Sequence, residues 1–145
     1  MRMVIQRVKE ASVVADGQLT GRIGQGLLVF FGVHSEDASV TTQWMADKLV
    51  NLRIFSDDQG KMNLSVQDVK GQILVVSQFT LYGDCSQGRR PDFGHSAPPQ
   101  VAEPIYDKFV REVGLVIPDV ATGRFGAMME VSLVNDGPVT FIVER

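Results

Sequence analysis

The sequence predicts one α+β domain spanning residues 1–145, built on a mostly antiparallel, curved, barrel-like β-sheet with two main helices. Short apolar segments separated by turn-forming residues are typical of strands joined by hairpins. Only two stretches repeat apolar residues at helical spacing. The 145 residues, 44% hydrophobic and 21% charged, have the size and composition of one globular domain. No repeat, low-complexity segment or linker divides them, which favours a single α+β unit.

The first quarter of the chain has the pattern of strands. Apolar residues within 4–15 form a strand that ends at 16–17, an Asp-Gly dipeptide that favours a tight hairpin turn. Residues 19–23 are the returning strand. The segment 26–33 is apolar at nearly every position, so we expect a central strand that is covered on both faces.

Two segments have the apolar spacing of helices. The first is predicted at 38–52, with Lys48 near its end, where the helix dipole favours a cation. Its apolar residues are Val40, Trp44, Met45, Leu49 and Leu52. The second helix repeats every four residues, at Val101, Ile105, Phe109 and Val113. Pro104 fits this helix only within the first turn, because a proline there loses no hydrogen bond.

Further strands are predicted from short apolar runs at 53–55, 62–64, 71–76, 128–134 and 139–143. Residues 57–60 have turn chemistry and separate the first two of these runs. Residues 135–138 form a similar turn between the last two. The segment 82–99 has no period and is too long for a plain connection, so we expect a functional or mobile loop.

Charge and cysteine content exclude several classes of protein. The net charge is −3, whereas a protein that coats nucleic acid is normally basic over much of its surface. A small basic patch that touches nucleic acid locally stays compatible with this charge. The single Cys85 excludes an intrachain disulfide and a zinc site built of cysteines. His34, His95 and Asp37 have no metal-ligand spacing, and we expect neither a metal nor a cofactor.

No segment suggests a membrane span or export. The longest apolar run, 26–33, has eight residues, whereas a membrane helix needs about 20. The first residues of the chain lack the long apolar stretch of a signal peptide. We therefore expect a soluble, cytoplasmic protein that does not enter a membrane.

Ser77, Gln78, Phe79 and Thr80 are the first candidate site. They follow a predicted buried strand, which anchors them on one side. Backbone N–H groups that leave the strand ladder there are suited to face a ligand and stabilise an oxyanion. The same residues also suit a strand that simply reaches solvent and turns polar. On their own they do not decide between these two interpretations.

The turn Asn135-Asp136-Gly137-Pro138 is the second candidate. Its composition fits an ordinary turn between the last two strands. Gly137 has no Cβ, so its backbone is able to approach a ligand closely. A cis Gly137–Pro138 bond would also project two carbonyls in the same direction.

Nucleophilic catalysis by the protein lacks a complete set of residues. Ser77 and Thr80 would each need a general base, and neither His34 nor His95 is near them in the sequence. A Cys85–His95 pair is conceivable because both residues lie in the irregular segment. An incidental loop cysteine explains Cys85 equally well.

Basic residues in loop-like segments are candidates for contact with phosphate. Arg89 and Arg90 are an adjacent basic pair, and Arg53 and Lys61 flank turn-like segments. Phe125, between glycines, offers a ring that could stack on a base. Solvated surface charge and a core aromatic are the alternative interpretations.

The two motifs together resemble the D-aminoacyl-tRNA deacylase family. Residues 77–80 match that family's S-Q-F-T signature, and 135–140 match its N-x-G-P-V-T signature. The similarity extends through 5–8, 53–57, 60–64 and 122–125. Two separated signatures in the right order, in a chain of the expected length, indicate one deacylase-like domain over residues 1–145.

The resemblance implies a homodimer that hydrolyses the ester between a D-amino acid and the terminal ribose at the acceptor end of aminoacyl-tRNA. It also implies action on glycine misattached to an alanine tRNA. In the family the Gly-Pro bond is cis and enters the active site of the other subunit, where Gly137 and Pro138 would bind substrate and exclude L side chains. Arg7 matches the arginine that braces this motif, and Phe125 matches the aromatic near the terminal adenosine.

Ser77, Gln78, Phe79 and Thr80 are accordingly the predicted catalytic segment. The resemblance assigns catalytic help to the 2′-hydroxyl of the tRNA and not to Thr80. We expect the backbone N–H groups of Phe79 and Thr80 to stabilise the oxyanion. Two alternatives stay open: a non-catalytic module that binds an RNA end, and a Cys85-dependent hydrolase of small esters.

Overall fold

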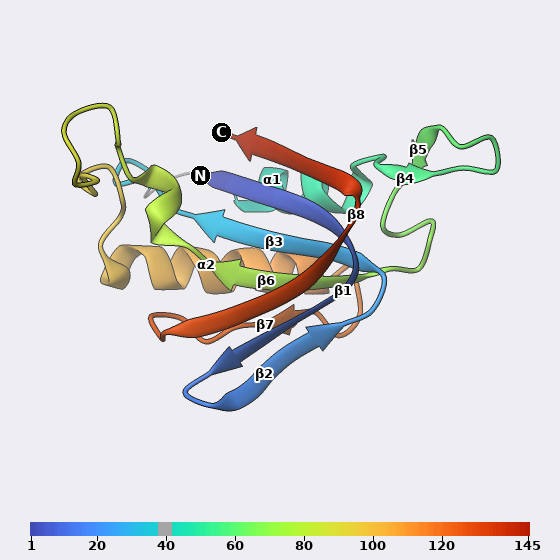
Figure 1. Ribbon diagram of the computed structural model, residues 1–145, viewed down its shortest axis with the longest axis horizontal. Coiled ribbons are helices and arrows are strands. Elements are labelled where there is room, and N and C mark those ends of the chain that lie inside the picture. The colour runs from blue at the N-terminus through green and yellow to red at the C-terminus, as the bar shows by residue number, and fades with distance from the viewer. Residues whose placement is uncertain (38–41) are drawn as a thin grey trace.

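The computed structural model describes residues 1–37 and 42–145, and shows a curled sheet with two α-helices along one side (Figure 1). The elements are β1 (Arg2–Ala15), β2 (Gln18–Ile23), β3 (Gly26–Gly32), α1 (Thr42–Asn51), β4 (Phe55–Ser56), β5 (Met62–Leu64), β6 (Gln72–Ser77), the 3-10 helix η1 (Phe79–Tyr82), α2 (Pro99–Gly114), β7 (Ala121–Thr122) and β8 (Met129–Glu144). The predicted α+β class and barrel-like sheet are confirmed. Within the described ranges, no helix has the length and apolar character needed to cross a membrane.

The sheet is built around β1. The first half of β1 pairs antiparallel with β3, and its second half pairs antiparallel with β2. Along the opposite edge, β8 pairs antiparallel with both halves. β6 and β7 extend the sheet from β3 in the parallel direction, so the sheet is mixed. The parallel part follows from the helices, because α1 connects β3 toward β6, and α2 connects β6 to β7, and parallel strands need such long crossovers.

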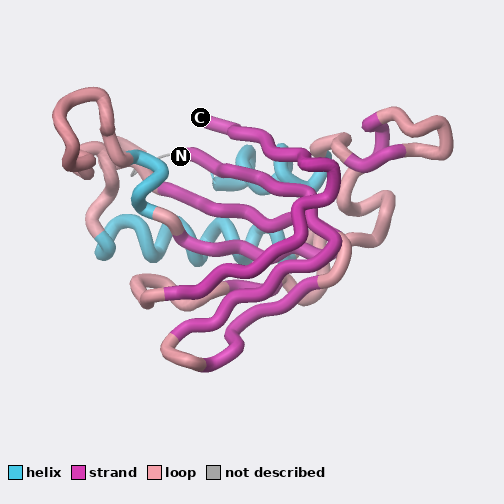
Figure 2. The backbone as a smooth tube through the Cα atoms, viewed as in Figure 1, coloured by secondary structure: helices cyan, strands magenta, loops and turns pink. Residues whose placement is uncertain are grey.

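The sheet curls until β2 lies against β7. A Cβ built on Gly21 in β2 would come within 2.8 Å of the Thr122 carbonyl oxygen in β7. β1 and β8 both bend where their ladder changes register, between Gln6 and Glu10 of β1. Figure 2 shows these strands curving together, which makes the sheet nearly closed.

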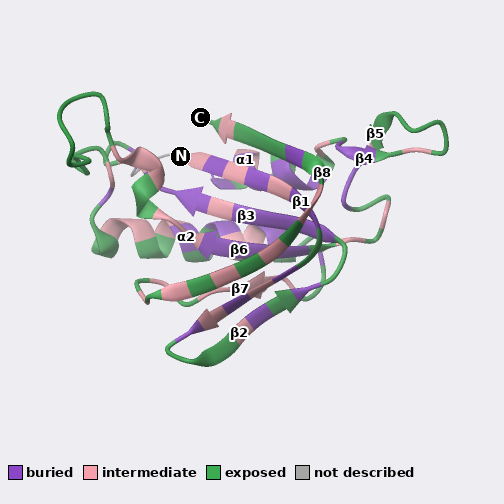
Figure 3. Cartoon of the chain, in the orientation of Figure 1, coloured by how far each residue is buried: buried purple, intermediate pink, exposed green. Residues whose placement is uncertain are grey.

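Apolar side chains fill both faces of the central strands. Leu27, Val29 and Phe31 of β3 belong to the larger cluster, which lies between the sheet and the helices. There the rings of Phe31 and Phe109 stack with centroids 4.2 Å apart. Leu28 belongs to a second cluster, inside the curl of the sheet. The predicted central strand, covered on both faces, is therefore confirmed, and Figure 3 shows β3 and β6 as the most buried strands.

Pro104 lies in the second turn of the second helix, whereas we expected it from the sequence within the first turn. α2 begins at Pro99, so the missing N–H of Pro104 leaves the Gln100 carbonyl without its helical donor. Both Pro104 and Gln100 are exposed, so water is able to hydrogen-bond that carbonyl. The most buried face of α2 also passes through Tyr106, whereas Ile105 is only partly buried.

The other predicted elements agree with the structure apart from small shifts. The first helix is confirmed from Thr42 to Asn51, and its predicted start at 38–41, including Val40, lies outside the described residues. The strands predicted around the 57–60 turn form the two-stranded β4–β5 hairpin. After β6 the chain turns into η1 instead of continuing as a strand.

The predicted turn at 135–138 is wrong as a hairpin turn, because β8 continues through it. The two halves of β8 pair with β1 and not with each other: Thr140 lies opposite Gln6, and Asn135 lies opposite Val8. Between these two pairs, β8 advances by five residues whereas β1 advances by two. The extra residues stand out from the ladder, and we call the segment 135–140 the elbow.

Candidate functional site

A pocket of about 390 Å³ opens where β6 ends. Its wall is mainly apolar and comes from β3, β6, η1, the first turns of α2 and the loop before β8. The lining includes Ser77, Gln78, Phe79, Tyr106 and Phe125. A largely apolar pocket with a few polar groups at one end is typical of a small-molecule site. Three of the four predicted catalytic residues, together with Phe125, thus meet at one cavity.

The hydrogen bonds around 77–80 leave two backbone donors outside the sheet. The ladder ends where the Gln78 N–H donates to the carbonyl of Phe31 (2.9 Å). In η1, the Leu81 N–H donates to the Gln78 carbonyl (3.4 Å). The N–H groups of Phe79 and Thr80 come before this bond and have no acceptor within the helix. They are therefore donors available to a ligand at the start of η1.

Side chains fix the conformation of the same segment. The Gln78 Nε2 donates to the Thr80 Oγ1. The Ser96 Oγ donates to the carbonyl of Phe79 (2.8 Å), which ties η1 to the following loop. Thr80 is exposed, and its hydroxyl is bonded to an amide and not to a general base. This arrangement does not activate Thr80 as a nucleophile.

Aromatic rings form much of the pocket wall. The Phe125 ring lies 5.8 Å from the Tyr106 ring, centroid to centroid. The Tyr106 hydroxyl donates to the Val75 carbonyl (3.0 Å), and burial raises the pKa of Tyr106, so this hydroxyl stays protonated. Phe79 is 57% exposed and meets the edge of Phe93, with centroids 5.1 Å apart. The pocket therefore offers flat apolar surfaces suited to a nucleoside.

The Arg7 side chain contacts the elbow through Asp136. Its side chain is nearly buried, and its Nε donates to the Asp136 carbonyl (3.0 Å). The Asp136 carboxylate lies 3.3 Å from the same Nε. The Nη1 of Arg7 donates to the carbonyl of Ile54 (2.6 Å), which links the elbow to the segment before β4. These contacts tie the elbow to β1 and to the segment before β4 within one chain.

The elbow itself is compact and exposed. The Gly137–Pro138 bond is cis, as expected, and Gly137 has a φ of 138°. The Asn135 Oδ1 accepts the N–H of Val139 (2.8 Å), which closes the elbow from inside. Gly137 and Pro138 are exposed at its tip. A fixed loop of main chain, without a side chain at Gly137, thus faces out of the protein.

The elbow and the pocket lie apart in one chain. Arg7, below the elbow, lies opposite Leu27, and Leu27 pairs with Ile73, whereas Ser77 pairs with Phe31. The two motifs are therefore offset by about 13 Å along the strands and by three strand spacings, about 14 Å, across the sheet. Figure 1 shows the bend in β8 at the end of the sheet opposite η1. Among the described residues, none from the elbow lines the pocket.

The other candidate catalytic groups lie outside the pocket. The rings of His34 and His95 stack with centroids 5.6 Å apart, and His34 meets Tyr82 edge-on. Cys85 is exposed and, in the described structure, lines no part of the pocket. The Asp37 carboxylate accepts the N–H of His34 (2.7 Å). Within residues 1–37 and 42–145, His, Cys, Asp and Glu form no cluster that could hold a metal.

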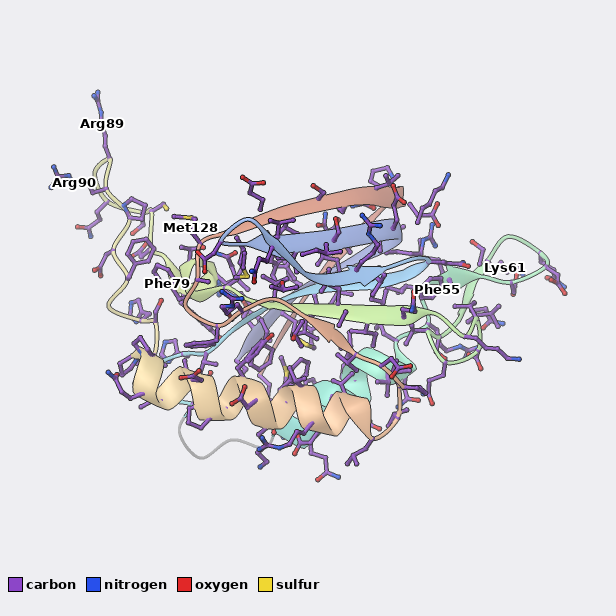
Figure 4. All side chains as sticks on the ribbon, turned by 90° about the horizontal axis from the view of Figure 1, so that it is seen from below. Phe55, Lys61, Phe79, Arg89, Arg90 and Met128 are labelled. Atoms are coloured by element: carbon purple, nitrogen blue, oxygen red, sulfur yellow. The ribbon has the colours of Figure 1, made fainter. Side chains whose placement is uncertain are left out.

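The basic residues do not form one patch. Arg89 and Arg90 lie at the tip of the loop on the Phe79 end of the molecule, whereas Lys61 lies at the opposite end (Figure 4). Arg53 is bound to Asn63, whose carbonyl accepts its Nε (2.7 Å). Because the fold separates these candidates for phosphate contact, Lys61 and the Arg89–Arg90 pair cannot act as one patch.

Sequence reasoning missed two residues that shape the pocket. Tyr106 was detectable in part, because it lies next to the apolar positions of the second predicted helix. Ser96 lies in the irregular segment, and nothing in its surroundings signals a bond to the Phe79 carbonyl. That bond joins residues 17 positions apart and depends on how the loop folds back.

The family model and the curated relatives that match this chain agree on one family. The model of the family described as D-Tyr-tRNA(Tyr) deacylase matches residues 4–144. A D-aminoacyl-tRNA deacylase of Desulfatibacillum aliphaticivorans is 58% identical over 144 residues, covering 99% of each chain. One of Bacillus cytotoxicus is 56% identical with the same coverage.

Solved structures share the fold. A c-Myc DNA Unwinding Element Binding Protein superposes with a TM-score of 0.93 at 39% identity, covering 100% of this chain and 99% of that one. A probable eukaryotic D-amino acid tRNA deacylase superposes with a TM-score of 0.83 at 20% identity, covering 98% and 97%. The second likeness supports the fold alone.

Proposed function

This chain belongs to the D-Tyr-tRNA(Tyr) deacylase family, and on that premise we propose that the pocket beside η1 is where a D-aminoacyl-tRNA ester is cleaved. The protein is a hydrolase that acts on the ester bond of D-aminoacyl-tRNA. The observation that carries the proposal is the position of 77–80. Ser77, Gln78 and Phe79 line the pocket, and the backbone N–H groups of Phe79 and Thr80 have no backbone acceptor among the described residues. Because tRNA is aminoacylated in the cytoplasm, we place the enzyme in that compartment.

The pocket binds the 3′ end of the substrate. The terminal adenosine rests against Phe125, and the ester carbonyl points at the N–H groups of Phe79 and Thr80. As water adds to the carbonyl carbon, these N–H groups stabilise the negative charge that develops on the oxygen. Their geometry is set before the substrate arrives, because the Ser96 and Gln78 side chains already hold the segment. Such preorganised donors contribute roughly 2.7–4 kcal/mol each to catalysis in other hydrolases.

The proton transfers are assigned to the substrate. The pocket wall that the structure describes contains no histidine, carboxylate or cysteine. The ribose 2′-hydroxyl, next to the ester, orients the water and assists the departure of the 3′ oxygen. The bond between the carbonyl carbon and this oxygen breaks, and the oxygen takes up a proton as the free amino acid leaves.

A second copy of the chain supplies the elbow. Within one chain the elbow lies too far from 77–80 to touch the same substrate atoms. Apolar side chains on β8, Val134, Phe141 and Ile142, are exposed on either side of the elbow, as expected of a surface that a partner covers. A two-fold dimer is the simplest closed arrangement in which each copy gives its elbow to the other.

The elbow acts as a chiral filter. Gly137 and Pro138 present main-chain oxygens to the α-amino group, and Arg7 and Asn135 prevent the elbow from moving aside. An L side chain collides with this main chain, a D side chain points away, and glycine has no side chain to collide. The filter rejects L residues without recognising particular D side chains. Glycine misattached to an alanine tRNA is therefore also a substrate.

The ratio of D to L deacylation tests this function. We expect release of the amino acid from D-Tyr-tRNA, D-Asp-tRNA and glycyl-tRNA at comparable rates, with L-Tyr-tRNA spared. Sedimentation at the assay concentration should give two copies per particle. Rates for the D esters that differ by orders of magnitude, or cleavage of L-Tyr-tRNA, would defeat the filter. A fully active monomer would defeat the shared site.

A further inference from the structure

Arg89 and Arg90 have no part in the chemistry above, yet they lie on the same end of the molecule as the pocket. Both are exposed, and Figure 4 shows their side chains extending beyond Phe79, away from the body of the protein. In the part of the chain that the structure describes, neither forms a salt bridge with a carboxylate. Two adjacent guanidinium groups without an internal partner point to an external anion.

The acidic residues of the same loop form no ion pair with these arginines in the described structure. Asp84 and Asp92 form an antiparallel bridge, with N–H···O distances of 2.7 and 2.9 Å. The Asp84 carboxylate accepts the N–H of Ser86 (2.8 Å), and this bond lowers the pKa of Asp84. The Asp92 carboxylate accepts the N–H of Gly94 (3.3 Å). Both carboxylates are thus bonded to backbone at the base of the loop.

The loop is attached directly to the pocket wall. Phe93 meets the ring of Phe79, and the Ser96 hydroxyl donates to the Phe79 carbonyl. Phe79 lines the pocket. Two residues separate Phe93 from Arg90, and the three steps of backbone span at most about 11 Å. The main chain of the basic pair therefore lies near Phe79 at the pocket wall.

We propose that Arg89 and Arg90 bind phosphates of the single-stranded 3′ end of the tRNA, next to the terminal nucleotide whose ester enters the pocket. This inference rests on the proposed function of that pocket. A guanidinium group binds a phosphate through two parallel hydrogen bonds. Contacts to phosphate position an RNA without reading its sequence, so the pair serves different tRNAs alike. It also explains how a chain of net charge −3 holds an RNA substrate.

Three substrates with the same D-tyrosyl ester isolate the contribution of phosphate. They are the full tRNA, a short single-stranded oligoribonucleotide, and adenosine with no phosphate. In the Arg89→Ala/Arg90→Ala double variant, we expect KM for the first two to rise about tenfold at low salt, with kcat unchanged. The slope of log KM against log salt should fall by about 1.4, or roughly 0.7 for each single-strand phosphate. Hydrolysis of the adenosine ester should not change.

A matched control removes two positive charges elsewhere. Lys108 and Arg111 are exposed on α2 and are absent from the described pocket lining. The Lys108→Ala/Arg111→Ala variant should keep the salt slope and KM of the parent. If KM and the salt slope of this control change as much as those of the double arginine variant, the effect is due to net charge alone. That result would overturn the inference.

Other outcomes have definite meanings. An unchanged salt slope on the oligoribonucleotide overturns the proposal, and an effect on the full tRNA alone places the arginines on duplex RNA, which also overturns it. Slower cleavage of the adenosine ester would trace the effect to a disturbed pocket and would also overturn the inference. Binding of the uncharged oligoribonucleotide is measured in parallel. If the parent protein cleaves no ester but loses this binding in the double variant, the proposed hydrolysis fails while the phosphate contact stands.

Discussion

At Gly137 the backbone leaves little freedom for substitution. Its φ of 138° is rare for residues with a side chain. A Cβ there would lie 2.7 Å from the Val139 Cγ2 and 3.2 Å from the Arg7 Nη2. Arg7 has little room to retreat, because its guanidinium is also bound to the carbonyls of Ile54 and Asp136. The elbow itself must move to accept a side chain at this position.

The Gly137→Ala substitution should therefore impair both catalysis and stability. We expect kcat/KM for D-Tyr-tRNA to fall at least about tenfold, with a loss of about 1–3 kcal/mol in unfolding free energy from backbone strain. Gly17→Ala is the matched control, because Gly17 also has a positive φ (75°) but open space around its Cβ position. It should lose stability and keep its activity. If the two variants have the same kcat/KM for D-Tyr-tRNA, the elbow is not part of the active site.

Thr80 tests whether the protein supplies a nucleophile. The Thr80→Ala variant keeps the backbone N–H of residue 80 and loses only the hydroxyl that Gln78 Nε2 binds. We expect it to retain substantial deacylation of D-Tyr-tRNA in single-turnover assays. A loss of several thousand-fold would restore Thr80 as the nucleophile. Cys85→Ser, an exposed change in the neighbouring loop, should leave the rate unchanged.

Among the elements, the β4–β5 hairpin shows how one carboxylate organises a turn. The Asp57 Oδ1 accepts the N–H groups of Lys61 (3.0 Å) and Gln59 (2.9 Å). These backbone hydrogen bonds, the one from Lys61 foremost, lower the pKa of Asp57 below its ordinary value of 3.8. The charged carboxylate is therefore favoured in the folded turn.

This shift fixes the pH range in which the turn weakens. Because the folded pKa is lowered, the stabilisation is complete above pH 3.8 and is lost as the pH falls through the lower, folded value. We expect the amide chemical shifts of Gln59 and Lys61 to titrate below pH 3.8 in NMR spectra. Asp57→Asn should abolish this titration. A midpoint at or above 3.8 would contradict the assigned hydrogen bonds.

At the scale of the whole molecule, the proposed sharing of the elbow between two copies depends on the exposed face of β8. Ile142 is 65% exposed although it lies within the β1–β8 ladder, opposite Val4. Burial of such a side chain at an interface stabilises association by roughly 1.5–3 kcal/mol. A charge placed there should therefore separate the two copies.

The Ile142→Glu variant is expected to sediment as a monomer and to lose deacylation of D-Tyr-tRNA, because each pocket then lacks the partner's elbow. Leu115→Glu is the control: Leu115 is 85% exposed at the end of α2 and should tolerate the charge in both assays. If Ile142→Glu stays dimeric and active, the contact between copies lies elsewhere. An active monomer would mean that one chain completes the site by itself.

Several features of the fold and site followed from local patterns. The apolar run at 26–33 became β3, buried on both faces. Of the helix predicted at 38–52, the described part became α1, Thr42–Asn51. The polar residues 77–80 follow β6 at the pocket, and three of them line it. These features are predictable because the period of apolar residues and the chemistry of turns act over a few neighbouring residues.

Whether 135–138 joins a hairpin or stands out from a continuous strand was decided only by tertiary structure. Its composition suits both, and the ladder with β1 selects the second. Similarly, Arg7 reaches the Asp136 carbonyl across 129 positions, and Ser96 reaches Phe79 across 17. The sequence by itself thus determined most of the strands, the two α-helices and the two signatures. The distance between those signatures depends on how the sheet curls, because contacts between distant residues add up over the whole chain and leave no local pattern.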